Sequence, residues 1–236
     1  ASCSIPPHLP LLLMSQVLSP SVSPIHPAGP DLAPRLLRIA WMGILLGVAI
    51  EILVLLALGM AGKLPPLLTI LADTAQKVTW STLVCAALAA AQTLVRVQAL
   101  GMAAAGLLGA PVALLLARSL HKAVNAALDA APATQTTTPW MLAGLKGVEY
   151  AVLGLLLIRL AKRARGLGAH AAAGAGLGLA CFGVLTWLMP LDGAQPQLMR
   201  AINEILHPMG CALVIYFGAQ FGSKLGARAG GIADDN

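Results

Sequence analysis

Long apolar runs, each about the length of a bilayer-spanning helix, dominate this chain. The run from Ile39 to Gly62, IAWMGILLGVAIEILVLLALGMAG, carries a single charged residue, Glu51, near its middle. About 20 apolar residues in a helix cross the hydrocarbon core of a bilayer. Five further segments of similar character follow. The pattern therefore predicts an all-α protein, a polytopic transmembrane helical bundle of about six spans, at residues 36–62, 78–96, 98–118, 140–161, 169–189 and 202–223.

Polar segments flank and separate these spans. Residues 1–34, rich in Pro and Ser, predict an extended N-terminal arm, and residues 227–236 predict a flexible polar tail, which leaves 35–226 as the transmembrane domain. The segment LPPLLTILADTAQK predicts either a short interfacial helix or an extension of the second span, because proline suits the first turn of a helix. Within it, Asp73 and Lys77 are four residues apart and can pair on one helical face.

The composition agrees with a lipid environment. The chain is 58% hydrophobic and only 10% charged, whereas soluble domains are roughly 25% charged. Most of its surface must therefore be apolar, so that lipid is the solvent. The net charge of +6 comes from Lys and Arg near the ends of the spans, with no basic stripe interleaved with aromatic residues. We expect membrane lipids and other membrane protein subunits, or further copies of this chain, as partners, and no nucleic acid.

The distribution of Lys and Arg predicts how the spans are oriented. With six spans, both termini and the loops after spans two and four share one side of the membrane. That side carries the dense cluster RLAKRARG, residues 159–166. The positive-inside rule then places both termini in the cytoplasm (N-in/C-in), with the inverted orientation as the alternative. The high Ala and Gly content favours a bacterial inner membrane, with an organelle inner membrane as the alternative.

Two sequence similarities raise the hypothesis of an internal repeat. A Trp-Met pair opens both span one and span four, and APVALLLARSLHK (110–122) can be laid over ALVIYFGAQFGSK (212–224). Two three-span halves of opposite orientation, a 3+3 inverted repeat, are the plan of many transporters. Chance similarity between helices rich in Ala, Leu and Val is the competing explanation.

Small residues at helical spacing predict close helix contacts. GxxxG patterns let backbones approach each other in a bilayer. Three of them supply the candidate packing residues Gly43, Gly47, Gly174, Gly178, Gly218 and Gly222. The four cysteines show no metal-binding or disulfide spacing. We therefore predict no metal and no cofactor, and we expect bound lipid.

Ionisable residues within the apolar spans are the candidates for chemistry. A carboxylate near mid-bilayer is costly and faces the bundle interior or a water-filled cavity. Glu51 is therefore either a proton or cation site or a hydrogen-bonding partner of a neighbouring helix. Lys146 and Glu149, three residues apart, either pair on one helical face or leave Glu149 pointing inward towards Glu51.

The start of span six, RAINEILHP, is the second candidate region. Arg200, Glu204 and His207 have spacings of four and three residues, so they can share one face. We expect Asn203, Glu204 and His207 to form a polar cluster near the non-cytoplasmic side. Glu-x-x-His also occurs in di-iron helical bundles, but this sequence lacks the second copy that such sites need. Pro208 removes a backbone donor and weakens the helix at this point.

Three functions are compatible with these features. The first is an integral membrane subunit or scaffold of a larger complex, with no catalytic centre of its own. The second is a small transporter or channel for protons, ions or a small solute, using Glu51, Glu149 and the Glu204–His207 pair, with Lys146 and Arg200 beside them. The third is a membrane enzyme acting on lipid or quinone. The sequence shows no catalytic motif, so we favour a protein that is not an enzyme.

Overall fold

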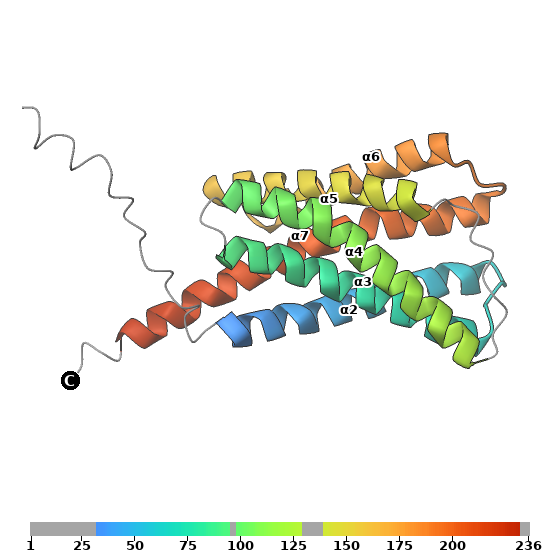
Figure 1. Cartoon of the computed structure of the whole chain (residues 1–236), viewed down its shortest axis with the longest axis horizontal. Helices are drawn as coiled ribbons and strands as arrows, with labels where there is room; N and C mark the ends of the chain where they lie inside the picture. Colours follow the sequence, from blue (N-terminus) through green and yellow to red (C-terminus); the bar gives the residue numbers. More distant parts are fainter. Residues whose placement is uncertain (1–31, 95–97, 129–138, 232–236) are drawn as a thin grey trace, which may run out of the picture. The chain divides into compact units, whose positions relative to one another are not determined.

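The structure is a computed structural model that describes residues 32–94, 98–128 and 139–231, and every regular element in these ranges is an α-helix. The helices, shown in Figure 1, are α2 (Leu32–Met60), α3 (Leu67–Leu94), α4 (Gln98–Ala127), α5 (Pro139–Lys162), α6 (Leu167–Leu188) and α7 (Ala194–Gly231). The predicted all-helical bundle is confirmed. Most of the predicted arm and the last residues of the predicted tail lie outside the described residues.

Several helices are longer than the predicted spans. Helix α3 begins just after Pro65 and Pro66, so the segment that contains these prolines extends span two and is not a separate interfacial helix. Helix α4 continues to Ala127, beyond the predicted end at 118. Helix α7 runs from Ala194 to Gly231, so the first residues of the predicted tail are helical.

Five of the six helices, all except α3, are long and apolar enough to cross a membrane. This confirms a multi-pass membrane protein. Helix α3 falls short in composition because Asp73, Gln76 and Lys77 lie in its first half. Its 28 residues make it about 42 Å long, and it packs against both α2 and α4. The sixth span stays a prediction, as does the orientation of the bundle in the membrane.

The distribution of polarity is the reverse of that in a soluble protein. Large apolar side chains, among them Leu45, Leu108 and Trp187, are exposed on the outside, whereas the ionisable residues Glu51 and Glu149 are buried. Lipid satisfies the first group, and contacts between helices satisfy the second.

Helices that follow one another in the chain pack together. Contacts between α2 and α3, α3 and α4, α4 and α5, and α6 and α7 are extensive, and α7 also packs against α2. The α5–α6 contact is much slighter, although residues 163–166 join these two helices directly. A 3+3 repeat would relate the α2–α3 contact to the α5–α6 contact, and these differ in extent, so the repeat stays a prediction.

Glycines allow the closest backbone contacts. A Cβ built on Gly47 would lie 2.6 Å from the Cα of Val78 on α3, and one built on Gly174 would lie 2.5 Å from the Cα of Met209 on α7. No side chain fits at such distances, so glycine is required at both positions if the helices are to stay this close. Four of the six glycines selected from sequence lie at such contacts: Gly43 and Gly47 against α3, and Gly174 and Gly178 against α7.

The other packing glycines differ from the sequence selection. Gly218 faces the side chain of Ile39, and the surroundings of Gly222 lie outside the described part of the chain. The α4–α5 contact depends on Gly106, Gly147 and Gly154. None of these three glycines has another glycine four residues away, so the GxxxG pattern did not single them out.

Candidate functional site

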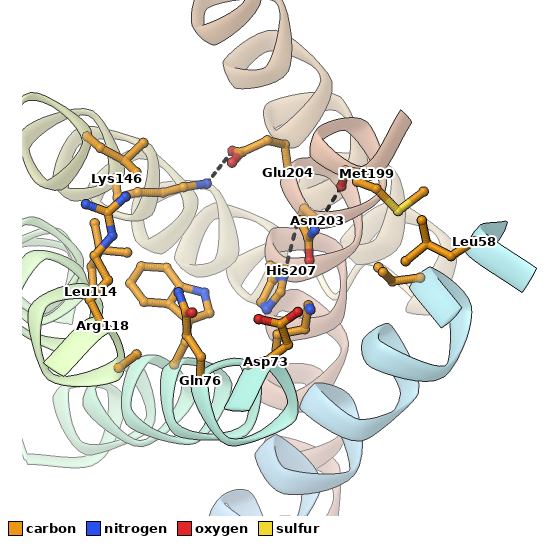
Figure 2. Close-up of a pocket in the computed structure, with 15 residues that line it drawn as sticks. Leu58, Asp73, Gln76, Leu114, Arg118, Lys146, Met199, Asn203, Glu204 and His207 are labelled. Carbon is orange, nitrogen blue, oxygen red and sulfur yellow. Dashed lines mark hydrogen bonds and ion pairs between the residues drawn. The ribbon is translucent and has the colours of Figure 1, made fainter. Parts of the chain in front are cut away.

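A charged cavity of about 390 Å³ lies inside the bundle, between residues of α2, α3, α4, α5 and α7. Figure 2 shows its lining side chains. Those on α3, α5 and α7 come from the first part of each helix, and those on α2 and α4 come from the last part, so the cavity occupies one half of the bundle. Its polar lining consists of Asp73, Gln76, Lys77, Arg118, Lys146, Asn203, Glu204 and His207.

Glu51 is held by an ion pair across a helix contact. Its carboxylate accepts a hydrogen bond from Lys77 Nζ, which links α2 to α3. The side chain of Glu51 is 4% exposed and that of Lys77 is 14% exposed. Lys77 lines the cavity, and Glu51 lies behind it. The sequence identified Glu51 as a residue that needs a partner, and the fold supplies that partner from another helix.

A second group of charges links α5 to α7. Lys146 Nζ donates to Glu149 Oε2 at 2.7 Å and also donates to Glu204 Oε2. The side chain of Glu149 is fully buried, and that of Glu204 is 13% exposed and lines the cavity. Figure 2 shows Lys146 reaching across towards Glu204. Lys146 and Glu149 therefore pair as their spacing predicted, and Glu149 is paired with Lys146 rather than with Glu51.

These two groups together have one negative charge in excess. Glu51, Glu149 and Glu204 supply three carboxylates, and Lys77 and Lys146 supply two ammonium groups. Because a buried charge without a partner is costly, these two groups favour a further positive charge nearby, which Arg118 on the same cavity wall or an added proton or small cation can supply. Glu149 Oε1 is buried and has only the Cys181 thiol, a weak donor, beside it. In the Lys146–Glu149–Glu204 triad, one ammonium group therefore serves two carboxylates.

His207 places a hydrogen-bond acceptor on the same cavity. Its Nδ1–H donates to the backbone oxygen of Asn203 at 3.0 Å, because a carbonyl oxygen can only accept. Nε2 then carries the free lone pair, and it is buried without a hydrogen-bond partner in the ranges that the structure describes. The ring lies against Trp80, with centroids 6.5 Å apart, and Trp80 packs edge-to-face on the buried Tyr150.

Asp73 differs from the sequence-based expectation. It does not pair with Lys77. Instead, its Oδ1 lies 3.5 Å from Nδ1 of His121 on α4. The expected local pair is wrong because both side chains have partners on neighbouring helices.

Arg200 contacts the end of α6, whereas the predicted cluster of Asn203, Glu204 and His207 lines the cavity. Its Nη1 donates to the backbone oxygens of Leu185 at 3.2 Å and Met189 at 2.5 Å, at the C-terminal end of α6. The last carbonyls of a helix lack intrahelical partners, so Arg200 caps α6. It does not line the cavity, unlike Glu204 and His207.

Helix α3 contributes three polar side chains to this site that were not among the candidate residues chosen from the sequence. Asp73, Gln76 and Lys77 form a polar face at helical spacing just before an apolar run, and this was the available signal. It indicated a polar interior, but it could not indicate which helices enclose it.

Among the described residues, no group of three or more His, Cys, Asp or Glu side chains is placed to hold a metal ion. No protein-family profile matches the chain, and neither a curated protein nor a solved structure shows significant similarity to it. The cavity is therefore the feature from which a function can be inferred.

Proposed function

We propose that this protein is a transporter or channel that moves protons or small cations through the charged cavity. The observation that carries the proposal is the triad in which one ammonium group, Lys146, serves two carboxylates, Glu149 and Glu204, within a bundle of membrane-crossing helices. Ionisable groups buried within membrane-spanning helices are rare and mark ion or proton pathways.

The arrangement suggests where the transported charge binds. Glu204 is the triad carboxylate that lines the cavity, so a proton or cation arriving there meets it first. When Glu204 is neutralised, Lys146 keeps Glu149 as its partner and the triad becomes electrically balanced. His207 lies one helical turn further along α7 and offers Nε2 as the next acceptor.

Proton flux into reconstituted vesicles tests this proposal. The purified protein is placed in vesicles containing a pH-sensitive dye, and a pH gradient is imposed. We expect flux above that of protein-free vesicles, and a decrease of about tenfold or more in Glu204→Gln, since a charge-assisted hydrogen bond is worth about 1.5–3 kcal/mol. Sodium and potassium gradients are tested in the same way, to separate protons from other cations.

A matched control uses an acidic residue outside the cavity. Asp192, in the α6–α7 connection, is exposed, so Asp192→Asn removes one carboxylate without touching the site and should leave the flux unchanged. The proposal is wrong if no cation moves faster than through protein-free vesicles, or if Glu204→Gln conducts as well as Asp192→Asn.

A subunit or scaffold in a larger membrane complex is the second candidate. It is supported by the outer face of α6, where a Cβ on Gly168, Gly176 or Gly183 would meet no atom within 4 Å. Small residues on an open helix face suit close packing against another helix. Purification in mild detergent with mass spectrometry tests this: stoichiometric companion subunits support it, and a lone monomer contradicts it. The membrane-enzyme alternative stays a prediction.

A further inference from the structure

A second cavity, of about 270 Å³, lies where α3 and α5 end and α6 begins. Gln92 comes from the last turn of α3, Ala161 from the last turn of α5, and His170 from the first turn of α6. Since the first cavity uses the opposite ends of α3 and α5, the two cavities lie in opposite halves of the bundle. This one belongs to the end that carries the basic cluster 159–166.

The lining of this cavity favours an anion. It contains Arg165 and His170 and has no Asp or Glu. His170 is 4% exposed, and its Nδ1–H donates to the Gly166 oxygen at 3.1 Å. With Nδ1–H engaged in this way, Nε2 accepts hydrogen bonds in the neutral ring and donates one to an anion in the imidazolium form. The ring is fixed by Tyr216, with centroids 4.8 Å apart.

The start of α6 adds backbone donors at the same place. Its N-cap residue, Gly166, lines the cavity and has no side chain that could cap the helix. The N–H of Ala169 already donates to the Gly166 oxygen at 3.1 Å, so a ligand would meet the N–H groups before it, which together with the helix dipole can bind a phosphate group. Arg165 and His170 lie on either side of these groups in the sequence.

A further contact prepares Gln92 as a donor. Arg35 Nη2 donates to Gln92 Oε1 at 3.4 Å, which ties the first turns of α2 to the last turn of α3. With its oxygen engaged in this way, the amide nitrogen is the part of Gln92 that can donate to a ligand. The ligand would therefore meet donors from α3, from the α5–α6 connection and from α6.

The deeper walls of the cavity are apolar. Leu157 and Ile215 lie further from the helix ends than Arg165 and Gln220 do, and α5 and α6 pack only slightly against each other. A ligand with an anionic head and an apolar tail matches this order of polar and apolar surfaces. Free phosphate matches only the outer part.

We propose that this cavity binds the headgroup phosphate of an anionic phospholipid, held by Arg165, His170 and the first N–H groups of α6. Basic pockets between transmembrane helices are known sites for such headgroups. The proposal is independent of cation transport, because it concerns residues at the other end of the bundle.

Thermal unfolding of the purified protein with added lipid tests the proposal. Phosphatidylglycerol in detergent should raise the unfolding midpoint more than phosphatidylcholine does. Arg165→Gln should need about tenfold more phosphatidylglycerol for the same rise, since it loses a charge-assisted contact to phosphate. Arg163→Gln is the matched control, because Arg163 is exposed in the same connection and does not line the cavity.

Three results would overturn the proposal. The first is an equal loss of response in Arg165→Gln and Arg163→Gln, which indicates only diffuse surface attraction. The second is an equal response of the wild type to phosphatidylcholine and phosphatidylglycerol. The third is a full response to inorganic phosphate alone, which indicates a free-phosphate site. If Arg165→Gln is already unstable in phosphatidylcholine, His170→Gln provides the same comparison.

Discussion

Replacing Lys146 by Met tests whether the buried triad is held by charge balance. The side chain of Lys146 is 8% exposed and serves both Glu149 and Glu204. Without it, two buried carboxylates face each other with no cation between them. Removing one partner of a buried ion pair costs about 3–5 kcal/mol. At roughly 2–4 °C per kcal/mol for a chain of this size, the unfolding midpoint should fall by about 6–20 °C.

Because the triad has two carboxylates and one ammonium group, removing one carboxylate should destabilise the protein less than removing the lysine does. Glu204→Gln leaves Lys146 paired with Glu149, so the charges balance and the cost should be only about 1 kcal/mol. The double variant Lys146→Met/Glu204→Gln leaves one unpaired carboxylate rather than two, so it should be more stable than Lys146→Met alone. Residues in one ion-pair network show such non-additive effects.

The assay is thermal unfolding of all variants in the same detergent, followed by circular dichroism. Lys122→Met is the matched control, because Lys122 is exposed and its replacement should change stability by less than about 0.5 kcal/mol. The reasoning is refuted if Lys146→Met lies within about 1 kcal/mol of wild type, or if Glu204→Gln costs as much.

Three further changes test other contacts. Gly47→Ile should force α2 away from α3 and lower the free energy of unfolding by about 1–3 kcal/mol or more. Gly176→Ile, on an open face, should be nearly neutral in the same unfolding assay. Equal effects of the two changes would contradict the close contact. Glu51→Gln should lower the free energy of unfolding by about 3–5 kcal/mol because Lys77 is left without its carboxylate. Replacing Lys77 by Met as well should restore much of the stability. If stability does not recover in the double variant, the ion pair is not what stabilises this contact. Arg200→Ala should remove two hydrogen bonds from the end of α6 and lower the free energy of unfolding by about 1.5–3 kcal/mol. Amide hydrogen exchange at the end of α6 should become faster. Unchanged exchange would show that Arg200 is not a cap.

Much of the architecture could be predicted from the sequence. Apolar runs long enough for a bilayer fix where helices form, because an unsatisfied backbone in lipid is too costly for any other local structure. The same argument singled out Glu51 and Glu204, since an ionisable group within such a run needs a polar surrounding. Lys146 and Glu149 could also be paired, because residues three apart on a helix face each other.

Only the tertiary structure decided which side chains meet across helices. Glu51 pairs with Lys77, 26 residues away, and Lys146 reaches Glu204, 58 residues away. Helical spacing predicts neighbours within one or two turns, so it favoured the Asp73–Lys77 pair that does not form. The cavity itself depends on how five helices pack, which close contacts at glycines allow. The sequence therefore determined where the helices form. The packing of the helices decided which buried charges pair with each other.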